Sequence, residues 1–377
     1  MTIFTVYFCG TSSTKYDDSK STYWNGELVS TLAKNNLGKE FAEWIIIDGP
    51  GSGNLQADEL FTEPGGYYKM TGVAFGLGWV ENVKHATNIM KGKFDWQRET
   101  LTEENYKQLK NAGIPIDDVE TKGSWFWRKY NYGSRHVTQQ QLQEQIIKQF
   151  RKDGVIPTQV NLIGWSRGGI SCTMLANAMW EDSDLKNIPV NIFAIDPVPG
   201  ALNFQGDKVK LGGNVKEYVA IYARDERSLG FNCAVPDTDS ATKIHIYPMA
   251  GRHATLVGNA ATNGVSGAKV FFEPGDIVRH YAETCLTRWG VSLDKKLMLT
   301  KAQLDQRLAT IKRSYDTYTT MRTQSYLGVC TDVQGEREIY YDGKHTNFTA
   351  AHAPRFSPDK GLSTGHILSS DYFNDII

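Results

Sequence analysis

Ser166 is the residue of this sequence best placed for nucleophilic chemistry. It stands in residues 164–168 (Gly-Trp-Ser-Arg-Gly), after an apolar run typical of a strand at 160–163 and before a helix-like run at 170–179. Strand, Gly-x-Ser-x-Gly and helix in this order are the context that a nucleophile elbow requires. The two glycines have no Cβ, so strand and helix can approach closely around the serine. The pattern favours a reactive serine in a strained turn over a Gly-Ser turn without chemistry.

A serine nucleophile needs a base to take its proton and a third group to orient that base. In hydrolases with this elbow, the acid and then the histidine follow the serine along the chain. Of the eight histidines, only His253 stands just after a strand-like run (243–249), downstream of the candidate acids and flanked by glycines. We therefore expect His253 to be the base, although most histidines in proteins are structural.

Two aspartates are candidates for the acid. Asp196 ends the first strand-like run after the elbow, at 189–195, and Asp225 follows the second, at 215–223. Either position can supply a triad carboxylate, because triads are recognised by geometry. Asp196 could instead shape the Pro-Val-Pro-Gly turn that follows it, or pair with Arg167. We therefore prefer Asp225 and keep Asp196 as the alternative.

The elements that must position these residues follow an α/β rhythm. Apolar, β-branched runs alternate with helix-like runs; strands are expected at 3–8, 41–47, 160–163, 189–195, 215–223 and 243–249, and helices at 27–33, 79–90, 170–179 and 277–289. This alternation predicts a mostly parallel sheet with helices on both faces. Each strand ends in a polar cluster, and sites in such sheets assemble at the carboxyl ends of the strands.

Two further segments complete the expected organisation. Residues 1–290 are predicted to form one catalytic domain with an insertion or lid at about 91–136, and a polar helix is expected to begin at Thr138. Residues 291–377 are predicted to be an extension packed on that domain. In the extension, Thr300 and Gln303 have capping-box spacing and begin an amphipathic pattern that runs to Tyr318, which predicts one long helix. The last fifty residues indicate no function.

Composition excludes several classes of protein. Lys and Arg total 41 against 42 Asp and Glu, and a nucleic-acid-coating protein would be more basic. The five cysteines are scattered in no metal-binding spacing, which predicts buried free thiols in a reducing compartment. Acyl transfer to a serine requires no metal, so no metal or cofactor is expected. The amino terminus reads as a strand rather than a signal peptide, and no apolar run approaches the ~18 residues of a spanning helix.

Aromatic and basic residues are concentrated within the expected insertion. The segment 123–135 contains five aromatic and three basic side chains and no acid. The central run of this segment is Trp125, Phe126, Trp127, Arg128 and Lys129. Aromatic rings beside Lys and Arg favour a membrane–water interface, where ring and charge are both satisfied. The alternative is a loop whose aromatic side chains fold back onto the core.

Beyond these single motifs, the chain resembles the α/β-hydrolase family of type VI secretion phospholipase effectors, whose elbow reads Gly-Phe-Ser-Arg-Gly. The similarity runs from Ile3 to about Gly258, in the family's order. The matching motifs are 10–11 (Gly-Thr), 48–53 (Asp-Gly-Pro-Gly-Ser-Gly), 76–78 (Gly-Leu-Gly), 164–168, 225–227 (Asp-Glu-Arg) and 251–253 (Gly-Arg-His). The chain departs from the family at Gly169, where alanine is usual, and after His253, where an acid-containing run is usual.

The resemblance implies an α/β-hydrolase fold and a phospholipase A that cleaves acyl esters of membrane glycerophospholipids. In that mechanism Ser166 attacks, and the amide of Arg167 and a second amide from the Gly10-Thr11 loop bind the oxyanion. It also implies export from the cytoplasm into a neighbouring cell, a secretion-apparatus partner and an immunity protein. A soluble carboxylesterase or thioesterase and a non-catalytic interaction module with a hydrolase fold remain the alternatives.

Overall fold

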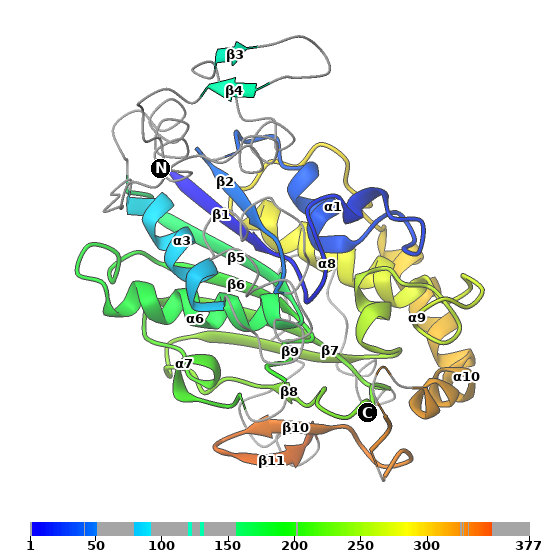
Figure 1. The fold of residues 1–377 in the computed structure, drawn as a ribbon. Coiled ribbons are helices and arrows are strands. Elements are labelled where there is room, and N and C mark those ends of the chain that lie inside the picture. Colours follow the sequence, from blue (N-terminus) through cyan, green and yellow to red (C-terminus); the bar gives the residue numbers. More distant parts are fainter. Residues whose placement is uncertain are drawn as a thin grey trace.

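A six-stranded sheet forms the centre of the protein. The computed structural model describes residues 2–40, 42–50, 79–91, 156–200, 203–324, 326, 328–330 and 332–348, with two short backbone strands at 120–122 and 129–131. The sheet order is β2-β1-β5-β6-β7-β9, and every neighbouring pair is parallel (Figure 1). Its strands are β1 (Ile3–Phe8), β2 (Trp44–Ile47), β5 (Gln159–Trp165), β6 (Val190–Ile195), β7 (Val215–Ala223) and β9 (Lys243–Met249). The expected α/β class is confirmed, and the arrangement is compatible with an α/β-hydrolase fold.

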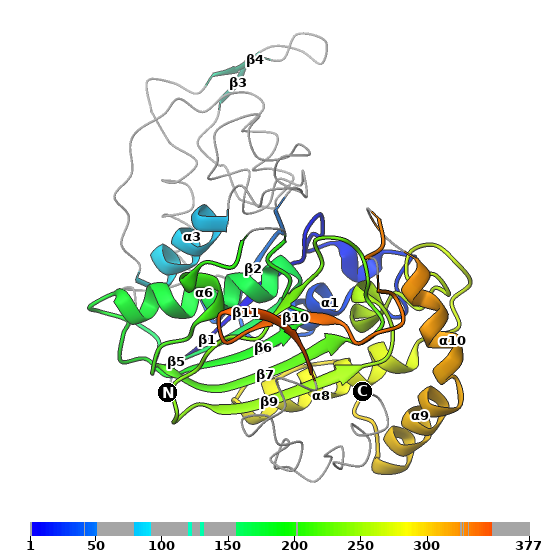
Figure 2. The ribbon, with the colours of Figure 1, turned by 90° about the horizontal axis from the view of Figure 1, so that it is seen from below.

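Helices cover both faces of this sheet. One face carries α3 (Trp79–Lys91), α6 (Arg167–Glu181) and α7 (Gly206–Val209). The other carries α1 (Leu28–Lys34), the 3-10 helix η2 (His253–Val257), α8 (Glu273–Arg288), α9 (Lys301–Arg313) and α10 (Tyr315–Thr320). Figure 2 shows α3 and α6 on the opposite side of the sheet from α8.

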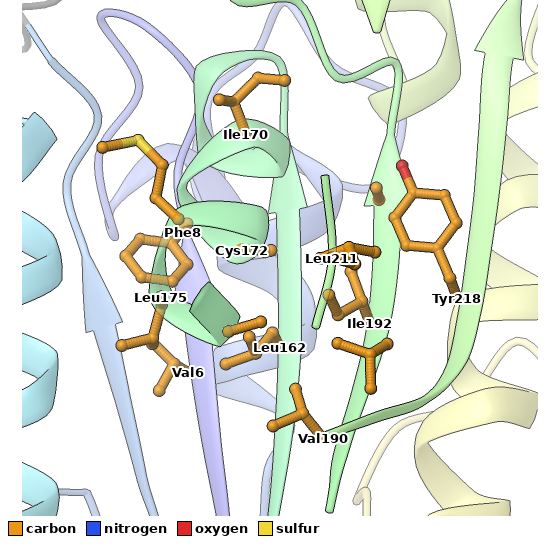
Figure 3. Close-up of a cluster of buried hydrophobic side chains, with 14 of the residues drawn as sticks. Val6, Phe8, Leu162, Ile170, Cys172, Leu175, Val190, Ile192, Leu211 and Tyr218 are labelled. Carbon is orange, nitrogen blue, oxygen red and sulfur yellow. The ribbon is translucent and has the colours of Figure 1, made fainter. Parts of the chain in front are cut away.

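The alternation of side chains along each strand divides the core in two. Val6 and Phe8 of β1 and Leu162 of β5 pack with the buried face of α6 (Figure 3). Tyr7 and Ile163, one position along in their strands, point to the other face and pack with α1 and α8. Successive strand residues point to opposite faces, so a sheet covered on both sides needs nearly continuous apolar strands.

The long helix expected after Thr300 is wrong, because the structure has two helices there. The capping box is present: Gln303 N donates to Thr300 Oγ1 at 3.3 Å and Thr300 N donates to Gln303 Oε1 at 2.9 Å. The helix α9 then ends at Arg313, and α10 begins at Tyr315. The break lets Tyr318 bury its ring against Phe271, with ring centroids 4.8 Å apart. Tertiary packing therefore overrides a continuous helical pattern.

The carboxyl-terminal extension is also more than helical. β10 (Glu338–Tyr341) and β11 (Lys344–Asn347) form a second sheet with β8 (Cys233–Ala234), in the order β11-β10-β8. β10 runs parallel to β8, with Ile339 opposite Cys233. This pairing carries the end of the described chain back to the loop that follows β7. The division at residue 290 stays a prediction.

Two predictions concern segments that lie largely or wholly outside the described residues. The expected insertion lies outside the described residues, apart from Lys91 and the backbone of β3 (Glu120–Lys122) and β4 (Lys129–Asn131). The helix expected from Thr138 also lies outside them.

Among the helices that are described, none is long and apolar enough to cross a membrane. All cysteines are free thiols, and four of the five are buried.

Candidate active site

Ser166 occupies the turn between β5 and α6. Its φ of 59° and ψ of −126° are outside the regions that residues other than glycine ordinarily adopt. The strand ends at Trp165 and the helix begins at Arg167, so a single residue reverses the chain. The strand–turn–helix expected around Ser166 is present, and the strain is located at the serine itself.

The glycines of the elbow are required by close approach of backbone to backbone. A Cβ on Gly164 would lie 2.2 Å from Gly168 O, and a Cβ on Gly168 would lie 2.2 Å from Phe8 O. A Cβ on Gly10 would lie 2.4 Å from the indole ring of Trp165. The loop after β1 therefore lies directly against the elbow.

Arg167 joins the loop after β1 to the elbow. Its Nη1 donates to Thr11 Oγ1 at 3.1 Å, and burial lowers its pKa to about 10. Its guanidinium also lies over the ring of Trp79, 5.7 Å from the centroid. The structure thus brings together Gly10, Thr11 and Arg167, the three residues expected around an oxyanion.

His253 is the first residue of η2, just beyond the carboxyl end of β9. Its Nδ1 lies 2.5 Å from Asp196 Oδ2, in a hydrogen bond between two buried side chains. The imidazole lies between two aromatic rings: the centroids of Trp165 and Phe231 are each 5.1 Å from its own. The ring is therefore fixed beside the elbow with a carboxylate on one nitrogen.

Asp196 directly follows β6 and has no exposed surface. Its Oδ1 accepts from Ala223 N at 2.9 Å and from Arg337 Nη1 at 2.5 Å, and its Oδ2 accepts from Arg337 Nη2 at 3.0 Å. Burial by itself raises the pKa of this carboxyl, but Arg337 and His253 outweigh burial and lower the pKa to about 2. Asp196 is an ionised, fully bonded partner for the histidine.

Asp225, the partner of His253 expected from the sequence, bonds other groups instead. Its Oδ1 accepts from Arg322 Nε at 2.8 Å, and its Oδ2 accepts from Arg224 Nη2 and Gly251 N, both at 2.8 Å. The structure places the alternative, Asp196, at the imidazole instead. The two aspartates follow neighbouring strands, and Asp196, which has a φ of 42°, is the one whose carboxylate reaches the ring.

The Asp-Glu-Arg tripeptide supports the loop that carries His253. Asp225 holds Gly251 N, as above, and Asp225 N donates to Gly251 O at 3.0 Å. Glu226 Oε2 accepts from His253 N at 3.2 Å, and its Oε1 accepts from Ser228 N at 2.7 Å. These buried carboxylates therefore hold the backbone of the histidine rather than its imidazole ring.

Arg337 bonds the carboxylate beside His253 but was not among the site residues expected from the sequence. It is 3% exposed and donates to Ala223 O at 2.7 Å and Phe231 O at 2.6 Å, in addition to both oxygens of Asp196. It lies just before β10, in the segment from which no function was inferred. A single arginine between two glutamates resembles any solvated charge run, so only the pairing of β10 with β8 identifies its partner.

The remaining predicted site residues are those of the expected membrane-contacting run. Trp125, Phe126, Trp127 and Arg128 lie outside the described residues, and only the backbone of Lys129 is described, in β4. In the part of the chain that the structure describes, no group of three or more His, Cys, Asp or Glu side chains could hold a metal ion.

Comparisons with known proteins are sparse. No protein-family model matches the sequence, and no curated protein matches it. An uncharacterized protein from Pseudomonas aeruginosa is 13% identical over 85% of this chain and 52% of its own, with a TM-score of 0.42. The Tle1 effector, solved bound to the VgrG spike of the Type 6 secretion system, is 12% identical over 68% of this chain and 50% of its own, with a TM-score of 0.32. The chain therefore spans about half the length of these solved structures, and likeness at this level carries no conclusion about function.

Proposed function

We propose that this protein is a serine hydrolase of carboxylic esters, acting through Ser166, His253 and Asp196. The observation that carries the proposal is the 2.5 Å hydrogen bond between His253 Nδ1 and buried Asp196, next to a strained serine at a strand–helix turn. Nucleophile, base and orienting acid are recognised by their geometry and roles. Asp196 takes the role for which Asp225 was preferred, because Asp196 is the carboxylate bonded to the imidazole.

The reaction would proceed by acyl transfer. Ser166 Oγ attacks the ester carbonyl while His253 Nε2 takes the hydroxyl proton, and the amide of Arg167 with one from the Gly10-Thr11 loop stabilises the oxyanion. The imidazolium then donates its proton to the leaving alcohol, and the acyl-enzyme forms. Water, deprotonated by His253, releases the fatty acid and restores the serine.

The proposed substrate is a glycerophospholipid, which makes the enzyme a phospholipase A. The rings of Phe231 and Tyr326 stack with centroids 5.0 Å apart, and Phe231 contacts His253, so aromatic side chains lie beside the base. Aromatic surface suits an acyl chain. The aromatic and basic run at 125–129 would contact the membrane surface. Export by a type VI apparatus, with a secretion partner and an immunity protein, belongs to the same proposal and rests on sequence resemblance.

The test is lipid-product analysis with the wild type, Ser166→Ala and Ser171→Ala. Ser171 is a buried serine in α6, the helix that begins just after Ser166; its hydroxyl donates to Arg167 O at 3.0 Å, and it is the matched control. We expect fatty acid and lysophospholipid from the wild type and the control, and none from Ser166→Ala. Equal turnover of a short-chain soluble ester and of micellar phospholipid would instead favour a carboxylesterase or thioesterase. Activity or a phenotype that survives in Ser166→Ala would favour the interaction module.

A further inference from the structure

Arg337 is paired with the carboxylate that orients the histidine. Its two terminal nitrogens contact the two oxygens of Asp196, Nη1 on Oδ1 at 2.5 Å and Nη2 on Oδ2 at 3.0 Å, in the bidentate geometry that arginine favours. The Arg337 side chain is 3% exposed and that of Asp196 is 0% exposed. Charges that are buried to this degree are weakly screened by water and salt.

We propose that Arg337 is a positioning residue that extends the activity of the site to lower pH, by neutralising Asp196 next to His253. In a serine triad, the buried carboxylate stabilises the imidazolium form of the histidine. Here the same carboxylate also faces a guanidinium, so its field at the imidazole is reduced. An imidazolium beside this ion pair is therefore stabilised less than one beside an unpaired carboxylate. This inference rests on the function proposed above.

The other charges near His253 do not substitute for Arg337. The other titratable and charged side chains of the surrounding elements come from α6, the loop after β7, β8, the turn before η2 and the carboxyl-terminal segment; they are Arg167, Arg224, Asp225, Glu226, Arg227, Cys233, Arg252, Arg322 and Tyr326. Asp225 is paired with Arg224 and Arg322, and Glu226 Oε2 lies 3.5 Å from Arg252 Nε. Asp225 and Glu226 are thus paired with cations other than Arg337. Arg337 is the cation that pairs with Asp196.

The structure offers a matched control within the same segment. Arg322 is also buried and also bonds a strand-end aspartate, with its Nε 2.8 Å from Asp225 Oδ1. Asp225 bonds the backbone of the histidine loop but not the imidazole. Arg322→Gln therefore removes a buried cation of the same kind without uncovering the carboxylate that faces the ring.

The measurement is the rate at which a fluorophosphonate labels Ser166, followed from pH 4.5 to 9. In this reaction the serine oxygen forms a bond to phosphorus, fluoride leaves with the electron pair of its bond, and His253 takes the serine proton. Labelling therefore reports the base without requiring the natural substrate. Full-length wild type, Arg337→Gln, Arg337→Lys and Arg322→Gln are compared, and a melting curve of each confirms that it is folded.

We expect the pH of half-maximal labelling to rise by about one unit in Arg337→Gln. It should stay close to the wild-type value in Arg337→Lys, which keeps the positive charge, and in Arg322→Gln. A folded Arg337→Gln that labels more slowly at every pH, with no shift of the midpoint, would show that the arginine is only structural and overturn the inference. If the wild type is not labelled at all, the proposed function fails and the inference with it.

A second pair of variants covers the case in which Arg337→Gln does not fold. Removing both members of a buried ion pair leaves neither charge uncompensated, so Asp196→Asn/Arg337→Gln is expected to fold more stably than Arg337→Gln alone. In Asp196→Asn the unpaired guanidinium opposes the imidazolium. The labelling midpoint should therefore be higher in the double variant than in Asp196→Asn, and equal midpoints would contradict the inference.

Discussion

At the scale of single residues, two buried aspartates with similar sequence positions have different tasks. Asp196 has a φ of 42°, a left-handed value that directs the chain sharply away from the end of β6. Its carboxylate meets the imidazole, while that of Asp225 meets two arginines and a backbone amide. The first bonds the imidazole of His253, and the second holds the backbone of the loop that carries His253.

This difference predicts that one amide substitution lowers activity and the other lowers stability. Asp196→Asn should lower kcat by about 10³- to 10⁴-fold, because the amide cannot hold the productive tautomer of His253 or stabilise its imidazolium. Asp225→Asn should instead lower the free energy of unfolding by roughly 3 kcal/mol, since it leaves Arg224 and Arg322 without their buried anion. Ester hydrolysis at pH 8 and urea unfolding of both variants separate the two outcomes. An inactive, stable Asp225→Asn beside an active Asp196→Asn would reverse the assignment.

The elbow glycines provide a second residue-scale prediction. A methyl group on Gly168 would lie 2.2 Å from Phe8 O, and backbone at that distance cannot move aside cheaply, so Gly168→Ala should cost about 3 kcal/mol or more, or prevent folding. Gly169 is the control, because a methyl group there would lie 3.0 Å from Pro197 Cβ. Gly169→Ala should change the melting temperature by only a few degrees, the gain in helix propensity offsetting the tight contact. Similar melting temperatures for both variants would refute the close approach.

At the scale of elements, local signals set where helices begin more reliably than where they end. The capping box that starts α9 needs only residues three positions apart, whereas the end of α9 at Arg313 serves the packing of Tyr318 in the next helix. The same distinction explains β10. Its strand character is a local property, but its parallel pairing with β8, more than a hundred residues earlier, is what delivers Arg337 to Asp196.

The capping box also makes a prediction at this scale. Thr300→Ala should destabilise the protein by about 1 kcal/mol, because the amide of Gln303 loses its acceptor at the first turn of α9. Thr310→Ala is the control in the same helix: its hydroxyl donates to Gln306 O within the helix and accepts an exposed bond from Arg313 Nη2, so alanine should be close to neutral. Chemical denaturation of the two variants gives the comparison. A loss of equal size in both would mean that the cap contributes nothing of its own.

At the scale of the whole molecule, buried charge lies at both ends of the sheet. Asp196 is at the carboxyl end of β6, and Glu217 lies near the amino end of β7, where it bonds His245, Arg288 and Trp289. Burial raises the pKa of Glu217, but the hydrogen bonds from these partners outweigh burial and lower its pKa to about 2. Both carboxyls therefore bind protons more weakly in the folded protein than in the unfolded chain.

This linkage predicts how stability depends on pH. A carboxyl with a lowered folded pKa stabilises the protein fully above its unfolded value, near 4.3, and the contribution is lost as the pH falls toward 2. Glu217→Gln should therefore be less stable than the wild type at pH 7, by on the order of 2 kcal/mol, and the difference should disappear near pH 2. Denaturation at several pH values measures both. Asp305→Asn, which removes the exposed pair with Lys301, should have little effect, and a pH-independent difference for Glu217→Gln would contradict the linkage.

The sequence by itself determined the six strands of the central sheet, the helices α1, α3, α6 and α8 that pack on it, and the position of the serine. Continuous apolar runs are sufficient to identify strands that are buried on both faces. Gly164 and Gly168 indicate that the strand and the helix approach each other closely around Ser166. The choice of His253 as the candidate base followed from its position just after a strand. Only the tertiary structure decided which aspartate faces the imidazole and that Arg337 joins it. Those contacts depend on turn directions and on pairings between segments far apart in the chain, to which no local propensity or spacing corresponds.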